Sequence, residues 1–105
     1  MKFLPEYSDE FEKQVRKYRS FKHVIKKKVE SLLEDPYHNC KSEPLHHRLK
    51  GFRSARLTQN IRILFAICEE AKQFVRVEIQ QRCNRLGNRG VVFVSIKVHE
   101  KAYKR

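Results

Sequence analysis

Two arginines, Arg56 and Arg62, are the residues of this chain best suited to bind a phosphate group. A guanidinium is always charged, and its planar fork of N–H donors matches the oxygens of a phosphate. Between residues 53 and 67 cationic or polar side chains alternate with apolar ones, which is typical of strands that bury a single face. Such strands would hold a row of guanidiniums above the sheet.

The spacing of the two arginines predicts how their strands pair. A two-residue turn at residues 59–60 would mix the two faces, whereas a three-residue loop at 58–60 places Arg56 opposite Arg62. Two like charges in this position destabilise a sheet unless an anion lies between them. We therefore expect a site that stabilises a pentacoordinate phosphorane, and the alternative is a solvated sheet face.

Three further side chains have types that suit chemistry at a phosphodiester. Glu43 precedes the arginine-rich strands, where it could act as the general base for a ribose 2′-hydroxyl. His99 ends the last predicted strand, on the face assigned to Arg62, and a histidine can protonate a leaving oxygen near neutral pH. Tyr103 could stack on a base, donate its hydroxyl or pack as an anchor, and its spacing does not separate these roles.

Other cations flank the same predicted face, namely Lys50, Arg53 and Lys97. Phosphate contacts give affinity and position without sequence information, so we expect these three residues to steer RNA. The whole chain is basic, with 24 Lys and Arg against 12 Asp and Glu and a formal net charge of +12. A nucleic acid is the expected partner; an anionic membrane surface and a merely basic protein without a polyanionic partner are the alternatives.

The remaining composition indicates one domain, residues 1–105, inside the cell. Cys40, Cys68 and Cys83 match no metal or secreted disulfide pattern, so reduced thiols are expected. No apolar run approaches the roughly 18 residues of a membrane span, and no hydrophobic signal core follows the first residues. We predict a cytoplasmic protein with no membrane partner, no metal and no cofactor.

Two helices are predicted ahead of the main strands. Asp9 and Glu12 have the spacing of a capping box, with Asp9 as the N-cap of the first helix. An apolar stripe begins at Phe21 and marks a second helix. This helix should end near Asp35, because Pro36 disfavours helical geometry in the residue before it. A polar loop is predicted from Pro36 to residue 52.

Strands are predicted at about residues 2–7, 53–58, 61–67 and 91–98, and Pro5 confines the first to an edge or a strand end. The aliphatic rows expected to meet the helices are Ile61, Ile63, Phe65 and Ile67, together with Val92, Val94, Ile96 and Val98. The opposite face of the last strand would carry Phe93, Ser95, Lys97 and His99. Residues 68–90 allow either a helix or a strand, so the sequence predicts an α+β fold with one undecided segment.

The stretch from residue 43 to residue 67 resembles, without a gap, a segment of the RelE/ParE toxin superfamily, and within it the YoeB-like branch. The matching positions are Glu43-Pro44-Leu45, His47, Leu49, Gly51-Phe52, Ser54, Arg56, Thr58 and Arg62. A looser match covers Ser95 to Tyr103, which is similar to the closing strand of the family. With the two helices, the resemblance covers about four fifths of the chain.

This resemblance implies a RelE-like domain: a short N-terminal strand, two helices and an antiparallel sheet, here with an insertion before the last strand. It implies the toxin of a type II toxin-antitoxin system, an mRNA interferase that enters the ribosomal A site and is silenced by a cognate acidic antitoxin. The implied endoribonuclease reaction is metal-free transesterification by the 2′-hydroxyl. Glu43 would be the general base, Arg62 the phosphate clamp, Arg56 a supporting clamp and His99 the general acid, and Tyr103 matches a functional tyrosine.

The sequence departs from the family pattern at several places. Arg53 replaces the tryptophan that YoeB-like relatives carry before the Ser-Arg step, and Lys97-Val98 replace the usual Gly-Thr. The segment from Glu69 to Gly90 is longer than the hairpin of the family. Two other functions remain open, a ParE-like gyrase poison and a basic RNA-binding module without cleavage.

Overall fold

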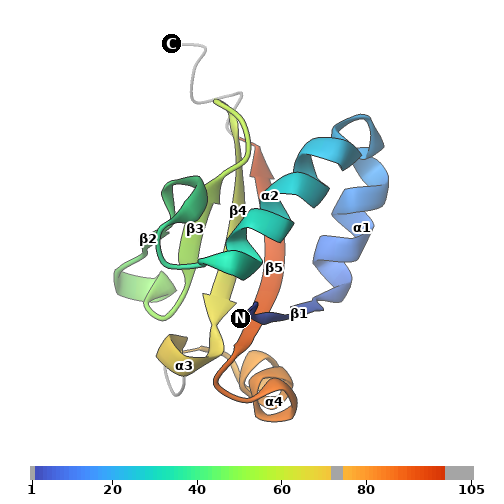
Figure 1. Ribbon diagram of the computed structural model, residues 1–105. Helices are drawn as coiled ribbons and strands as arrows, with labels where there is room; N and C mark the ends of the chain where they lie inside the picture. Colours follow the sequence, from blue (N-terminus) through green and yellow to red (C-terminus); the bar gives the residue numbers. More distant parts are fainter. Residues whose placement is uncertain (1, 72–74, 99–105) are drawn as a thin grey trace.

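The computed structural model describes residues 2–71 and 75–98, in which a five-stranded sheet is flanked by helices (Figure 1). The strands lie in the order β1-β5-β4-β3-β2. Their bounds are β1 Leu4–Tyr7, β2 Glu43–Pro44, β3 Arg53–Arg56, β4 Ile61–Ile67 and β5 Gly90–Val98. The predicted α+β class is confirmed, but the sheet is mixed rather than purely antiparallel, because β1 runs parallel to β5.

Both edge strands contain a proline, Pro5 in β1 and Pro44 in β2. Proline has no backbone N–H for a ladder, so an edge is where a sheet accommodates it. The prediction that Pro5 confines its strand to an edge is confirmed.

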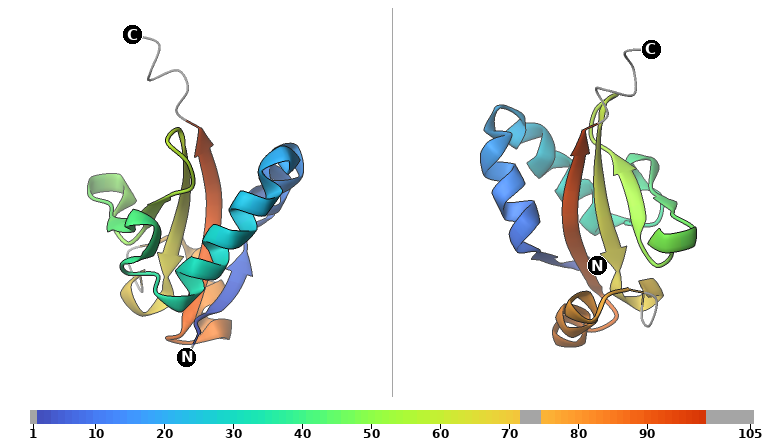
Figure 2. Two further views of the ribbon diagram at one scale, coloured as in Figure 1. Left: turned by 45° about the horizontal axis from the view of Figure 1, so that its top comes forward. Right: turned by 180° about the vertical axis from the view of Figure 1, so that it is seen from behind.

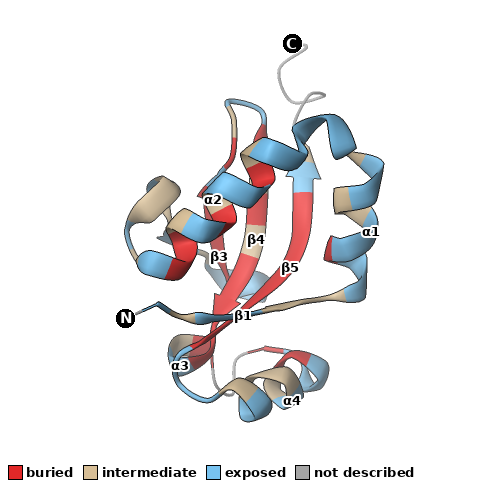
Figure 3. Cartoon of the chain, turned by 45° about the vertical axis from the view of Figure 1, so that its right-hand side comes forward, coloured by how far each residue is buried: buried red, intermediate tan, exposed pale blue. Residues whose placement is uncertain are grey.

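Helices α1 Asp9–Lys17 and α2 Lys22–Glu34 cover one face of the sheet (Figure 2). The buried residues of α2 form one stripe facing the sheet, as Figure 3 shows. The N-cap of α1 is Ser8 and not Asp9, because the Ser8 hydroxyl accepts the backbone N–H of Phe11 at 3.0 Å. Helix α2 ends at Glu34, with Asp35 as its C-cap, as predicted from Pro36.

The predicted loop between β3 and β4 is confirmed. Arg56 pairs with Arg62 across the two strands, and the backbone N–H of Leu57 donates to the carbonyl of Ile61 at 2.8 Å. The even positions of β3 and β4 therefore share one face and the odd positions face the helices.

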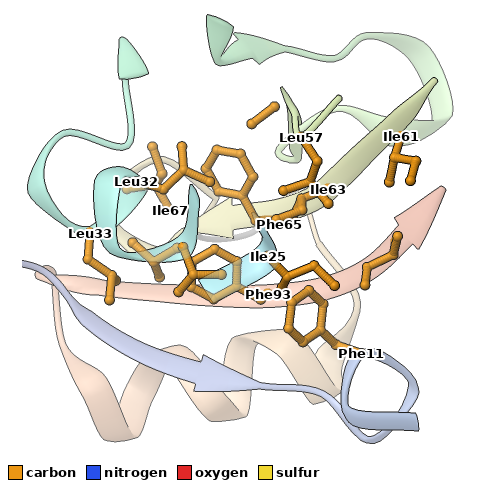
Figure 4. Packing of buried hydrophobic residues seen from close by; sticks show 14 residues of the cluster. Phe11, Ile25, Leu32, Leu33, Leu57, Ile61, Ile63, Phe65, Ile67 and Phe93 are labelled. Atoms are coloured by element: carbon orange, nitrogen blue, oxygen red, sulfur yellow. The ribbon is translucent and has the colours of Figure 1, made fainter. Parts of the chain in front are cut away.

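Strand β5 is buried on both faces, which corrects the prediction for its first half. Phe93 lies against the helices with Phe11 and Phe65 (Figure 4), whereas Val92 and Val94 pack in a second cluster on the far face. The reason is a register shift: Leu64 pairs with Ser95 and Phe65 with Phe93, so Val94 is an extra residue. A bulge of this kind reverses the inside and outside positions of a strand. Beyond it the prediction holds, since Ile96 and Val98 face the helices.

The undecided segment is helical where the structure describes it, with α3 Cys68–Ala71 and α4 Val77–Leu86. Both helices contribute to the second cluster, through residues such as Ala71 and Ile79. A disulfide joins Cys68 to Cys83, with Cα atoms 5.2 Å apart, so the expectation of three reduced thiols is wrong for this pair. Cys40 is a free thiol.

Gly90 lets α4 approach the start of β5. A Cβ at this position would lie 2.5 Å from the Cβ of Leu86 and 2.9 Å from the sulfur of Cys68. Only glycine fits here without a shift of α4. None of the helices in the described residues combines the length and apolar character that crossing a membrane requires.

Candidate active site

Three cations form a row across the face of the sheet opposite α1 and α2. Arg56 on β3 pairs with Arg62 on β4, and Arg62 pairs with Lys97 on β5. Neighbouring strands lie about 4.8 Å apart, so the row places three positive charges within the reach of one phosphodiester and its neighbours. The bulge at Val94 precedes this row and leaves Lys97 on the same face as Arg62.

Arg62 is held at the centre of the row by two partners. Its Nε donates to the hydroxyl of Ser54 at 2.8 Å, and its Nη2 donates to the carboxylate of Glu43 at 3.0 Å. The side chain is 25 % exposed. A guanidinium has five N–H donors. These two bonds fix the plane of the Arg62 guanidinium, and its other N–H groups donate to neither Ser54 nor Glu43.

A pocket of about 460 Å³ opens beside this pair. Its lining combines the charged residues with a leucine wall, and consists of Glu43, Leu45, Leu49, Ser54, Arg62, Ile63, Leu64 and Lys97. Apolar walls with a few convergent polar groups are typical of ligand sites. This pocket therefore suits an anionic ligand that also has a flat, less polar part, such as a nucleotide.

Glu43 reaches the pocket from the two-residue strand β2, where it pairs with Ser54. Its side chain is 61 % exposed. A carboxylate in this position has solvent on one side and the Arg62 guanidinium on the other. The resemblance implies one site for Glu43 and Arg62, and the structure brings the two side chains into contact. The catalytic role of each stays a prediction.

The structure places Arg53 away from this pocket, so the prediction that it flanks the exposed face is wrong. Strand residues at an odd separation point to opposite faces, and Arg53 is three positions from Arg56. Its side chain is 9 % exposed and forms a salt bridge of 2.9 Å with Glu70 of α3. The predicted contact of Arg53 with RNA conflicts with this burial.

The other predicted residues have mixed outcomes. Lys97 lines the pocket, and Arg56 is exposed on the same face. Lys50 is exposed in the turn between the short helical segment His47–Leu49 and β3. His99 and Tyr103 lie outside the described residues, so their roles stay predictions.

Sequence reasoning missed Ser54 as a member of the site. The signal was present, because Ser54 is two positions from Arg56 and strand alternation puts both on one face. Its hydroxyl acts as the acceptor that orients the Arg62 guanidinium. Within residues 2–71 and 75–98, no three histidine, cysteine or acidic side chains cluster closely enough to hold a metal ion.

The tyrosine beside Arg53 has a shifted pKa. Burial, followed by the hydrogen bond that its hydroxyl donates to Glu69 at 3.0 Å, raises the pKa of Tyr37 to about 12. The charges of Glu69 and Glu70 act in the same direction, and the Arg53 guanidinium opposes them. Tyr37 is therefore a neutral hydrogen-bond donor at physiological pH.

Comparison with known proteins shows that toxins of toxin-antitoxin systems share this fold. The chain is similar to a structure of the RelBE2 toxin-antitoxin complex from Mycobacterium tuberculosis, with a TM-score of 0.62, 18 % identity, and coverage of 93 % of this chain and 99 % of that chain. The YoeB/ParE toxin from Agrobacterium tumefaciens gives a TM-score of 0.67 at 12 % identity, over 91 % of this chain and 98 % of that one.

A third similar structure is the YoeB-YefM complex from Staphylococcus aureus, with a TM-score of 0.60, 16 % identity, and coverage of 94 % of this chain and 99 % of that chain. No family model and no curated protein matches the sequence. The fold of the chain is therefore the RelE-like fold, as the sequence resemblance implied.

Proposed function

We propose that this protein is the toxin of a type II toxin-antitoxin pair and that it cleaves messenger RNA in the ribosomal A site. The observation that carries the proposal is the Glu43 carboxylate 3.0 Å from the Arg62 guanidinium, inside a row of cations on one sheet face. A base beside a phosphate clamp is the minimum that cleavage at a ribose phosphate needs. The shared fold is consistent with this function.

In the proposed reaction, Glu43 takes the proton of a ribose 2′-hydroxyl. The 2′-oxygen then attacks the adjacent phosphorus, the bond from phosphorus to the 5′-oxygen breaks, and a 2′,3′-cyclic phosphate and a 5′-hydroxyl result. Arg62, with Lys97 and Arg56 beside it, stabilises the charge that builds on the phosphoryl oxygens. We assign the protonation of the leaving 5′-oxygen to His99 from the sequence alone.

The partner that silences the toxin would be an acidic antitoxin. The net charge of +12 makes the surface of the toxin strongly positive. The row of Arg56, Arg62 and Lys97 is part of that surface. A protein segment rich in Asp and Glu laid over the row would exclude RNA by charge and by volume. The similar structures include a heterotetrameric YoeB-YefM toxin-antitoxin complex from Staphylococcus aureus.

Primer extension on a translated message tests the proposal. We expect new message ends with the wild type, none with Glu43→Gln, Arg62→Ala or His99→Ala, and none on the same message when translation is blocked. The matched control is Arg76→Ala, which removes an exposed arginine that pairs with Glu78 at the start of α4. Unchanged message ends together with altered plasmid supercoiling would contradict the proposal and favour a gyrase poison.

A further inference from the structure

Arg53 connects three separate segments of the chain. Its Nε donates to the hydroxyl of Ser42 at 2.9 Å, its Nη2 to the carbonyl of Tyr37 at 3.2 Å, and its Nη1 to Glu70 at 2.9 Å. The guanidinium also lies 5.4 Å from the centre of the Tyr37 ring. One buried cation thus fixes the loop after α2 and the helix α3 to strand β3.

Ser42 is the residue next to the proposed base. Its hydroxyl accepts from Arg53 and donates to the carbonyl of Pro36 at 2.6 Å, so both the donor and acceptor capacities of this group are engaged. These two bonds fix the rotamer of Ser42 and the path of the chain that enters β2.

The backbone alone holds Glu43 weakly. Strand β2 has two residues, it lies at the edge of the sheet, and Pro44 has no N–H to give to the ladder. A strand of two residues is shorter than the usual range of about 3–10 residues, so its ladder holds it weakly and side-chain contacts add to its stability. The contact between Ser42 and Arg53 supplies one immediately before Glu43.

The two faces of the sheet are linked through the paired residues. Glu43 pairs with Ser54 in the ladder, and each is preceded by a residue whose side chain points to the helix side. On that side Arg53 binds Ser42, and on the other side Arg62 binds both Ser54 and Glu43. A shift of Ser42 would therefore displace the Glu43 carboxylate from Arg62.

We propose that Arg53 is a positioning residue that keeps the carboxylate of Glu43 in place by holding Ser42 from the opposite face of the sheet. The proposal rests on the proposed nuclease function for its kinetic consequence, but its structural part stands without it. Arg53 touches no RNA in this scheme. Its effect is on the rate of the chemical step, since misplacement of a catalytic group by about 1 Å can lower that rate about 100-fold.

The kinetic test compares Ser42→Ala with Arg53→Met in a ribosome-dependent cleavage assay. We expect kcat to fall about 10- to 100-fold in both variants with KM nearly unchanged, and Arg53→Lys to recover part of the loss. Ser20→Ala, which removes an exposed serine hydroxyl between α1 and α2, is the matched control and should keep full activity. Ser42→Ala keeps the Arg53 to Glu70 pair, so it remains informative if Arg53→Met unfolds.

An NMR measurement without RNA separates this proposal from the nuclease function. The carboxyl carbon signal of Glu43 in the wild type and in Arg62→Ala defines the paired and unpaired states. We expect Ser42→Ala and Arg53→Met to move this signal toward the unpaired position, and Ser20→Ala to leave it unchanged. A signal that stays at the paired position in folded Ser42→Ala and Arg53→Met would overturn the proposal, whether or not the wild type cleaves RNA.

The same variants distinguish a direct RNA contact. A rise in KM with unchanged kcat in Arg53→Met would mean that Arg53 binds RNA itself, and this result would also overturn the positioning role. If the wild type does not cleave RNA but the NMR shifts are as expected, the nuclease function is rejected. The structural part of the proposal, that Arg53 positions the Glu43 carboxylate through Ser42, is then supported.

Discussion

Arg53 and Arg62 lie on adjacent strands but belong to opposite faces of the sheet, and their surroundings differ accordingly. Arg53 donates to three polar groups, has a carboxylate partner in Glu70 and is 9 % exposed. Arg62 has two partners, lines an open pocket and is 25 % exposed. Both side chains are arginines, so the difference in their surroundings comes from the face of the sheet on which each strand places them.

The largest expected effect is on the open side. Arg62→Ala should lower cleavage about 100- to 1,000-fold, as does the loss of one donor at other charge-stabilising sites. The free energy of unfolding should change by no more than about 1 kcal/mol, since an ion pair with a carboxylate as exposed as Glu43 stabilises little. Cleavage rates and urea denaturation, measured on the same preparation, check both parts. An unfolded Arg62→Ala would place this arginine with Arg53 as a structural residue.

For Arg53, on the buried side, we expect a larger loss of stability than for Arg62 and a smaller loss of cleavage. Arg53→Ala leaves the Tyr37 carbonyl and the Glu70 carboxylate without this donor, and we expect a loss of about 2–3 kcal/mol in the free energy of unfolding. This is less than the cost of breaking a fully buried pair, because the Glu70 side chain is 31 % exposed. Urea denaturation of Arg53→Ala, Glu70→Ala and the double variant measures the coupling between them. Additive losses would show that the pair contributes nothing beyond its separate contacts.

Tyr37 reports on the buried side by its titration. Because its folded pKa is about 12 and the model-compound value is 10.0, the unfolded chain loses this proton first as pH rises. The stabilisation from neutral Tyr37 is complete below pH 10 and is lost as pH rises through the folded pKa. The ultraviolet absorbance of tyrosinate, with Tyr37→Phe subtracted, should show the high pKa, and Glu69→Gln should lower it. A titration near the usual tyrosine range would indicate that the hydroxyl is in solvent.

The smallest expected effects come from the flanks of the cationic row. Arg56→Ala or Lys97→Ala should each weaken RNA binding a fewfold and reduce the slope of log affinity against log salt by about 0.7. Arg53→Met, which removes the charge, should leave this slope unchanged, because the Arg53 side chain does not face RNA. Affinities measured over a series of salt concentrations give the slopes. Equal slopes for the Arg56, Lys97 and Arg53 variants would contradict the assignment of Arg53 to the face that does not bind RNA.

Sequence patterns could predict most of the helix side of the molecule. The alternation along β4, the stripe of α2 and the loop before Ile61 each depend on local periodicity, and all agree with the structure. The pairing of Arg56 with Arg62 followed from them. The resemblance to RelE-like toxins added the RelE-like fold, and it added the expectation that Glu43 is the general base, which periodicity could not supply.

The far side was harder to predict, for identifiable physical reasons. The bulge at Val94 reverses alternation within one strand, and both faces of β5 are apolar there, so no pattern marked it. The α4 segment contains apolar residues at both helical and strand spacings. Its disulfide depends on Cys68 and Cys83 meeting in space, which spacing along the chain does not reveal. The prediction for Arg53 used its charge and neglected strand alternation, which puts Arg53 on the face opposite that of Arg56.

The prolines in β1 and β2 have a consequence for the behaviour of the protein at high concentration. A second molecule that tried to extend the sheet at either border would meet a position with no N–H to offer. The strong positive charge of each copy adds repulsion to this mismatch. Fibril growth and strand exchange are thus disfavoured at both edges of the sheet. The protein can bury a hydrophobic core without exposing an edge strand that pairs readily with another molecule.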